Sequence, residues 1–209
     1  MSVLTIAETH PACEVLGPGN RFVVWVQGCP LNCRGCVSPQ WIPAGGGRTV
    51  PVADLAARIV DEAVDGLTFS GGEPFAQAGA LADLVDAVRA RRDLSVLSYS
   101  GHTLAHLARH GTDPQRRLLS TLDILIDGPY LPRRQASLRW RGSSNQRIHL
   151  LSDRHRQLAG EPDVSAGLQF ELGRDGSLRW LGVPAVADFR TRLEQRLGLV
   201  PPSAEESGR

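Results

Sequence analysis

Three cysteines lie close together near the N-terminus, and this cluster constrains the chain more than any other feature. Cys29, Cys33 and Cys36 follow a C-x3-C-x2-C spacing, and no fourth cysteine lies nearby. An iron–sulfur cube contains four irons and is normally held by four thiolates. Three thiolates leave one iron without a protein ligand, and that iron can bind a substrate or cofactor directly. The spacing therefore predicts a [4Fe-4S] cluster that takes part in catalysis.

The overall composition is that of an ordinary globular protein. The chain has 209 residues, of which 42% are hydrophobic and 22% charged, so it can form one core domain with a small appendage. The formal net charge of +1 favours neither a nucleic acid nor a membrane as a partner. All basic residues other than histidine are arginines. The absence of lysine excludes a Schiff-base mechanism and a Walker-type phosphate loop.

The N-terminus has no basic region followed by an apolar run, so we expect no signal peptide. No stretch approaches the roughly 20 apolar residues that a membrane-spanning helix needs. We therefore expect a cytoplasmic protein. In that reducing compartment clustered thiols bind metal more often than they form disulfides.

Strand and helix patterns alternate between residues 20 and 130. Short apolar strands are expected at 22–26, 67–69, 94–99 and 122–126, and helices at 52–64, 81–88 and 104–110. This alternation predicts an α/β fold with parallel strands, in an open sheet or a partial barrel. Ligands bind beyond the C-terminal strand ends of such folds. The segments that follow the strands should therefore converge: the cysteine loop, 70–74, 100–102 and 127–129.

The pattern changes after about residue 150. Residues 169–181 are typical of a β-hairpin with Asp175-Gly176 in its turn, and residues 185–197 of a closing helix. The polar end of the chain, 201–209, is predicted to be a disordered tail. We therefore expect a core domain at 1–150, a hairpin–helix extension at 151–200 and the tail.

Several motifs extend the cysteine pattern in a specific order. They are Gly17-Pro18-Gly19-Asn20-Arg21, Gln27-Gly28-Cys29, Arg34-Gly35-Cys36, Ser70-Gly71-Gly72-Glu73-Pro74, Tyr99-Ser100-Gly101, Leu125-Ile126-Asp127-Gly128-Pro129-Tyr130 and Trp140-Arg141-Gly142-Ser143-Ser144-Asn145-Gln146-Arg147. The ordered series is more specific than any single motif. Through it the chain resembles the radical S-adenosylmethionine superfamily, and most of all the activating enzymes of anaerobic ribonucleotide reductase.

The resemblance implies a partial (β/α) barrel and two cofactors, a [4Fe-4S] cluster on Cys29, Cys33 and Cys36 and S-adenosylmethionine. It also implies that one electron cleaves S-adenosylmethionine to a 5′-deoxyadenosyl radical. That radical abstracts hydrogen from a glycine of a partner glycyl-radical enzyme. A flavodoxin or ferredoxin type protein is the implied electron donor. The protein itself supplies position, electrostatics and exclusion of water.

The resemblance also implies which residues bind S-adenosylmethionine. Gly71 and Gly72 leave room for the methionine end, and the Glu73 carboxylate can complement its ammonium group. The residue before the third cysteine is usually aromatic in the superfamily and lies against the adenine, but here it is Gly35, as in the reductase-activating branch. Adenine must then be held by other groups. The cofactor-binding residues expected on this basis are Ser70, Gly71, Gly72, Glu73, Pro74, Gly35, Asp127 and Gly128, with no catalytic residue beyond the cluster ligands.

Two alternatives remain open at this point. The enzyme could act on a small molecule or a peptide, because the resemblance ends near residue 150. The cysteines could instead form a structural zinc site in a non-catalytic binding module, completed by Cys13, His10 or His102. A further group of residues is either a solvated face or a docking edge for an acidic partner segment: Arg133, Arg134, Arg139, Arg141 and Arg147.

Overall fold

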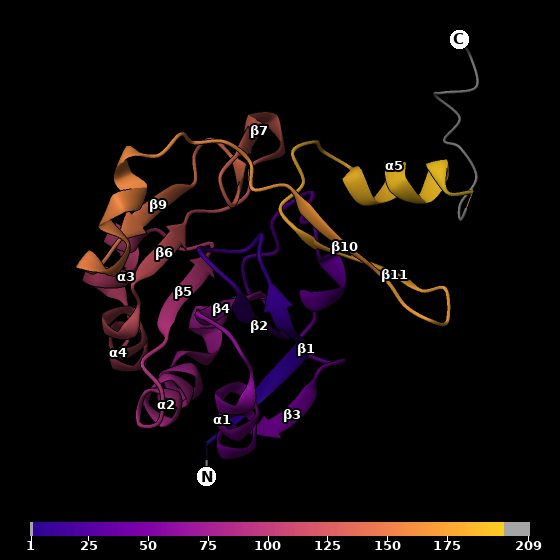
Figure 1. The fold of residues 1–209 in the computed structure, drawn as a ribbon. Helices are drawn as coiled ribbons and strands as arrows, with labels where there is room; N and C mark the ends of the chain where they lie inside the picture. Colours follow the sequence, from indigo (N-terminus) through magenta and orange to yellow (C-terminus); the bar gives the residue numbers. More distant parts are fainter. Residues whose placement is uncertain (1, 199–209) are drawn as a thin grey trace.

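A seven-stranded mixed sheet forms the centre of the computed structural model, which describes residues 2–198 (Figure 1). The strand order is β3-β1-β2-β4-β5-β6-β9. The four inner strands β2, β4, β5 and β6 run parallel, and β1, β3 and β9 are antiparallel to their neighbours. The bounds are β1 Val3–Cys13, β2 Arg21–Val26, β3 Arg48–Pro51, β4 Gly66–Gly71, β5 Ser95–Ser100, β6 Ile124–Asp127 and β9 Arg147–Leu150. The predicted α/β class is confirmed.

Helices connect the parallel strands, as the sequence pattern predicted. The bounds are α1 Val52–Asp61, α2 Ala78–Arg89, α3 Leu104–His110 and α4 Asp113–Thr121. The sequence pattern did not reveal α4, because it buries a single hydrophobic residue, Leu118. Its start is specified instead by a capping box between Thr112 and Gln115, with Pro114 in the first turn.

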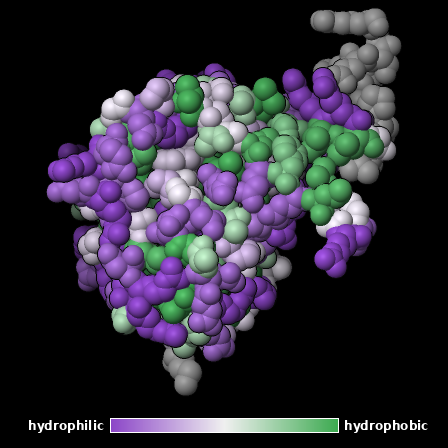
Figure 2. Space-filling view, in the orientation of Figure 1, coloured by the Kyte–Doolittle hydropathy of each residue, from purple (hydrophilic) through white to green (hydrophobic). Residues whose placement is uncertain are grey.

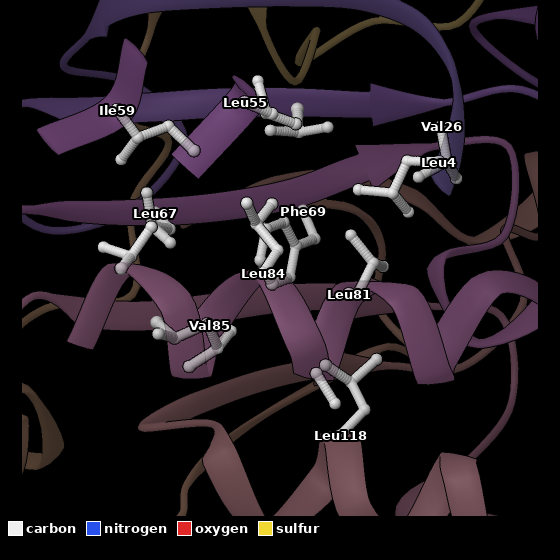
Figure 3. Packing of buried hydrophobic residues seen from close by; sticks show 14 of the residues in the cluster. Leu4, Val26, Leu55, Ile59, Leu67, Phe69, Leu81, Leu84, Val85 and Leu118 are labelled. Atoms are coloured by element: carbon white, nitrogen blue, oxygen red, sulfur yellow. The ribbon is translucent and has the colours of Figure 1, made fainter. Parts of the chain in front are cut away.

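All four helices pack against one face of the sheet. Alternate residues of β2 separate the two faces: Phe22, Val24 and Val26 join the cluster that contains the helix residues, whereas Val23 and Trp25 belong to a second cluster. Figure 3 shows the helix-side packing of Leu55 and Ile59 from α1 with Leu67 and Phe69 of β4 and Leu81, Leu84 and Val85 of α2. The other face of the sheet must therefore be covered by different elements.

Part of that second face is covered by residues from beyond position 150. Leu181 and Val183 pack with Val23 and Trp25, and Leu158 packs against the cluster around Leu97. Leu158 lies in a short 3-10 segment, η4 (Asp153–Gly160). Leu158, Leu181 and Val183 therefore contribute to the core rather than only to the surface.

The predicted hairpin is present as β10 (Leu168–Leu172) and β11 (Leu178–Gly182), and the predicted helix is shorter, α5 (Phe189–Arg196). The hairpin is joined to β1 by a hydrogen bond between His10 Nε2 and the Glu171 carboxylate (2.9 Å) and by the ion pair Glu8–Arg179. Its outward face is apolar, as the green area over it in Figure 2 shows, with Phe170 50% and Leu172 78% exposed. The predicted tail at 201–209 lies outside the described residues.

Two further strands form a small hairpin, β7 (Gln135–Leu138) and β8 (Arg141–Ser143). It follows β6 and precedes β9 in the chain.

None of the helices in the described part of the chain combines the length and hydrophobicity needed to cross a membrane.

Arg21 is fully buried at the N-terminal end of β2 and joins three parallel strands. Its guanidinium donates to Thr68 Oγ1 (2.7 Å), Ser95 Oγ (2.8 Å), and the carbonyl oxygens of Pro18, Leu67 and Ser95. No carboxylate makes an ion pair with it among the described residues. Burial lowers the pKa of Arg21 to about 10, so the group remains protonated at neutral pH. The motif that ends in Arg21 therefore organises the N-terminal ends of the parallel strands, whereas the cysteines follow the C-terminal end of β2.

We predict that Arg21→Met lowers the free energy of unfolding by about 3–5 kcal/mol, because it leaves several buried oxygens without a donor. Chemical denaturation monitored by far-UV circular dichroism measures this loss. Arg91→Met at an exposed position is the matched control and should change stability by less than about 0.5 kcal/mol. Equal, small effects of both substitutions would contradict the role assigned to Arg21.

Candidate functional site

A cavity lies at the C-terminal ends of the parallel strands, and it is open to solvent. Its volume is about 140 Å³. Segments that are far apart in the sequence meet there, as the strand pattern predicted: the cysteine loop, the segment after β4, the end of β5 and the turn after β6. The lining residues are Cys29, Leu31, Cys33, Cys36, Ile42, Ser70, Gly71, Gly72, Glu73, Pro74, Tyr99, Ser100, Gly101, Gly128, Tyr130 and Gln146.

The cysteine loop is attached to the chain segment that follows it. The backbone N–H groups of Gly28 and Cys29 donate to the carbonyl oxygens of Trp41 and Ile42, both at 2.9 Å. The buried Gln27 side chain donates to the carbonyl oxygen of Pro43 at 2.7 Å. These contacts fix where the loop leaves β2, so that all three thiols line one cavity.

The three thiols are free and half-buried. Burial raises the pKa of Cys33 and Cys36, and the neighbouring Cys29 raises the pKa of both further. A thiol must lose its proton to bind a metal, and metal cations offset the cost of burying the thiolate. The cavity is therefore a poor place for three free thiolates and a good one for three metal-bound thiolates.

The donor set fits an iron–sulfur cube better than a single zinc ion. Within residues 2–198, no three His, Cys, Asp or Glu side chains converge closely enough to hold one metal ion. A cube takes each thiolate on a different iron, so its ligands need not converge on one point. The three candidates for completing a zinc site do not line the cavity: Cys13 is buried in the second-face cluster, His10 contacts Glu171, and His102 stacks on His106. The geometry therefore disfavours the zinc alternative.

Gly71 and Gly72 bring the segment after β4 directly onto the start of the cysteine loop. Gly71 has a φ of +100°, and a Cβ on Gly72 would lie 2.2 Å from the carbonyl oxygen of Gly28. The N–H of Gly72 donates to Val26 O at 2.8 Å and that of Glu73 to Gly28 O at 2.9 Å. The sequence suggested that these glycines leave room for a ligand. The structure adds a second reason, since their missing side chains permit backbone-to-backbone contact.

Glu73 is 2% exposed and joins the ends of β4 and β5. Its Oε1 accepts hydrogen bonds from Phe75 N–H (3.0 Å) and Ser100 Oγ (2.9 Å), and its Oε2 accepts one from Gly101 N–H (2.8 Å). Burial raises the pKa of Glu73, while these three hydrogen bonds lower it. Glu73 therefore holds two of the cavity's walls together as well as facing its interior.

Six of the predicted cofactor-binding residues line the cavity, and two, Asp127 and Gly35, do not. Ser70, Gly71, Gly72, Glu73, Pro74 and Gly128 are lining residues. The Asp127 carboxylate accepts a hydrogen bond from Leu104 N–H at 2.6 Å, at the start of α3. Gly35 has a φ of +72° and packs against Pro132 and Tyr130.

Several lining residues were not predicted from the sequence, notably Tyr99, Tyr130 and Gln146. Tyr99 lies on the face of β5 opposite the helices, and its buried hydroxyl has no hydrogen-bond partner among the described residues. Gln146 accepts from the N–H groups of Gly142 and Ser143 and donates to Gly128 O at 3.1 Å. All three lie in the ordered motifs, but only the fold shows that they face the same cavity as the cysteines.

The arginine group after residue 130 is divided by the structure. Arg139 and Arg141 form ion pairs with Glu161 and Asp163. The remaining members, Arg133, Arg134 and Arg147, are exposed. At most these three are available as the docking edge that the sequence suggested.

Comparison with known proteins finds relatives over the part of the chain that contains this cavity. A family model described as "4Fe-4S single cluster domain" matches residues 15–149. The anaerobic ribonucleoside-triphosphate reductase-activating protein of Vibrio cholerae is 36% identical over 149 residues, which is 67% of this chain and 94% of that protein. The proteins of the same name from Enterobacteria phage T4 and Escherichia coli are 30% and 29% identical, over 66% and 68% of this chain and 89% and 96% of their own lengths.

We predict that Gly72→Ala lowers the free energy of unfolding by about 1–3 kcal/mol, because its Cβ would overlap the Gly28 carbonyl. Thermal or chemical denaturation measures the change. Gly45→Ala is the matched control, since a Cβ there meets nothing within 4 Å. It should change stability by less than about 0.5 kcal/mol. Wild-type stability for Gly72→Ala would show that the close contact with Gly28 is not required.

Proposed function

The chain belongs to the family of anaerobic ribonucleoside-triphosphate reductase-activating proteins with a 4Fe-4S single cluster domain, and from this premise we propose that it is a radical S-adenosylmethionine enzyme that activates a glycyl-radical enzyme. It would abstract hydrogen from a glycine of a partner of the anaerobic ribonucleotide reductase type. One observation carries the proposal: three free thiols line the same cavity as the segment 70–74.

The bound cluster and S-adenosylmethionine supply one-electron cleavage of the sulfonium S–C5′ bond, which yields methionine and a 5′-deoxyadenosyl radical. The chain would position the two cofactors relative to each other and exclude water from them. Cys29, Cys33 and Cys36 would each hold one iron. Residues 70–74 and Gly128 would form the wall against S-adenosylmethionine, with Oε2 of Glu73, which accepts a single hydrogen bond, directed to the ammonium group. Gly35 and Asp127 would act indirectly, by shaping that wall.

The open mouth of the cavity supports a macromolecular target. A loop of a partner protein can reach a cavity that is open to solvent, whereas an enclosed one would admit only a small molecule. The four helices that connect the parallel strands, α1 to α4, lie on one face of these strands, and this supports the partial (β/α) barrel of the radical S-adenosylmethionine type rather than a sheet covered by helices on both faces.

The remaining proposals follow from the same family. We propose residues 1–150 as the core domain and 151–200 as a hairpin–helix extension. A flavodoxin or ferredoxin type protein is the proposed electron donor. A cytoplasmic location is proposed because the free thiols need a reducing compartment.

We predict that Cys33→Ala abolishes cluster binding and reduces S-adenosylmethionine cleavage at least about 100-fold, because two thiolates cannot hold the cube. Iron and sulfide content after anaerobic reconstitution, together with 5′-deoxyadenosine formation, measure the effect. Cys13→Ala is the matched control, since Cys13 is buried in the second-face cluster away from the cavity. It should retain the cluster. Normal cleavage by Cys33→Ala would disprove the ligand assignment.

We predict that reduced, cluster-loaded protein produces a glycyl radical in its partner enzyme when S-adenosylmethionine is present. Electron spin resonance of the mixture measures the radical, and a partner with its target glycine changed to alanine is the control. Cleavage of S-adenosylmethionine without a glycyl signal would instead favour a small molecule or peptide as the hydrogen donor. Transfer of deuterium from a labelled substrate into 5′-deoxyadenosine would then identify it.

A further inference from the structure

We propose that residues 158–184 are a working part of the cofactor cavity. They hold the β7–β8 hairpin in place, and this hairpin fixes the ring of Tyr130 as a stacking surface for the adenine of S-adenosylmethionine. The inference rests on the proposed function, and it assigns a role to the part of the chain that the family model does not match.

The far end of the β7–β8 hairpin is held by the segment 158–163. Arg139 pairs with Glu161 (3.3 Å) and donates to Leu158 O (3.2 Å), and its backbone N–H donates to Asp163 Oδ1 (3.1 Å). Arg141 pairs with the same Asp163 carboxylate. The two arginine side chains are only 11% and 12% exposed, whereas their carboxylate partners are 50% and 51% exposed, so each guanidinium is held in place at the edge of the solvent. The segment therefore anchors the hairpin.

The near end of the hairpin is joined both to the chain after β11 and to Tyr130. Gln135 Nε2 donates to the carbonyl oxygen of Pro184 at 2.8 Å, and its Oε1 accepts from the Tyr130 hydroxyl at 2.7 Å. One amide side chain thus connects the extension to the cavity wall. The next residue along the wall is held as well, since Leu131 N–H donates to Ser143 Oγ at 3.2 Å.

The ring of Tyr130 lies between two glycines, Gly35 and Gly142. A Cβ on Gly142 would lie 3.2 Å from two ring carbons, and one on Gly35 would lie 3.5 Å from another. The glycines leave the space that the ring occupies, and the hydroxyl contact with Gln135 fixes its orientation. A ring held in place before binding loses little freedom when a ligand stacks on it.

Tyr130 is also the aromatic residue best placed to contact a purine. The cavity has two aromatic lining residues within the described chain, Tyr99 and Tyr130. Tyr99 packs against two core clusters, and its hydroxyl is buried. A planar base gains affinity from stacking on an aromatic side chain. The geometry therefore assigns the adenine to the side of the cavity that the extension supports.

The test measures S-adenosylmethionine binding to full-length, cluster-loaded protein by isothermal titration calorimetry. Tyr130→Leu should weaken binding roughly five- to a hundredfold, in line with the loss of one stacked base. Gln135→Leu and the double substitution Glu161→Gln with Asp163→Asn should weaken it roughly two- to thirtyfold, because they act through the position of Tyr130. Asp93→Asn removes an exposed ion pair with Arg154 and is the matched control, with unchanged affinity expected.

Hydrogen exchange of residues 128–146 in the ligand-free protein provides a second measurement that does not depend on activity. Exchange should be faster in the Gln135 and Glu161/Asp163 variants and unchanged in Asp93→Asn. If Gln135→Leu fails to fold, Gln135→Glu tests the same link. It keeps an acceptor for the Tyr130 hydroxyl and removes the donor to Pro184.

The outcomes separate the two proposals. Failure of the wild-type protein to bind S-adenosylmethionine would overturn the proposed function, and this inference with it. Tight binding by the wild type and by every variant, with unchanged exchange of residues 128–146, would overturn this inference alone. Weakened binding by Tyr130→Leu but not by the Gln135 and Glu161/Asp163 variants would leave the adenine contact standing and overturn the role of the extension.

Discussion

The contact between the backbones of Gly72 and Gly28 is the constraint on which the site depends. Parallel pairing of β2 and β4 continues past the last strand residues, through Gly72 N–H to Val26 O and Glu73 N–H to Gly28 O. Two segments separated by more than forty residues are thereby held side by side where the cysteine loop begins. Any side chain at position 72 would separate them, because no rotamer can move a Cβ away from the backbone. The position of the thiols relative to segment 70–74 follows from this pairing.

Glu73 extends the same constraint to a third strand. Its carboxylate accepts hydrogen bonds from Phe75, Ser100 and Gly101, so the end of β4 is joined to the end of β5. Aspartate at position 73 would be one methylene shorter. Glutamine would direct its amide N–H at one of the groups that donate to Glu73, so that hydrogen bond would be lost. The Gly-Gly-Glu sequence is therefore required by the architecture of the cavity before any ligand is considered. This explains how a short motif can be both structural and functional.

Much of the fold followed from the sequence, because buried strands and amphipathic helices leave a clear hydrophobic period. The strands around 22–26 and 94–99 and the helix at 104–110 lie where the pattern predicted them. Strand β1 was not predicted, since its eleven residues mix polar and apolar side chains and its pairing with β2 is interrupted by register shifts. The hydrophobic residues of β1 therefore recur with no fixed period. Tyr130 and Gln135 were not recognised as part of the site because their significance depends on tertiary contacts that no local pattern records.

The second face of the sheet explains what residues 158–183 contribute to the fold. One face is covered by four helices that the parallel crossovers supply. The other contains Val23, Trp25, Leu97 and Ile126, which also need cover. Here Leu158, Leu181 and Val183 provide part of that cover, and all three follow the region matched by the family model. Because the same chain segments bind the β7–β8 hairpin beside the cavity, burial of this face and support of the cavity wall are a single structural arrangement. A chain without these residues would have to cover Val23 and Trp25 and hold Tyr130 by other means.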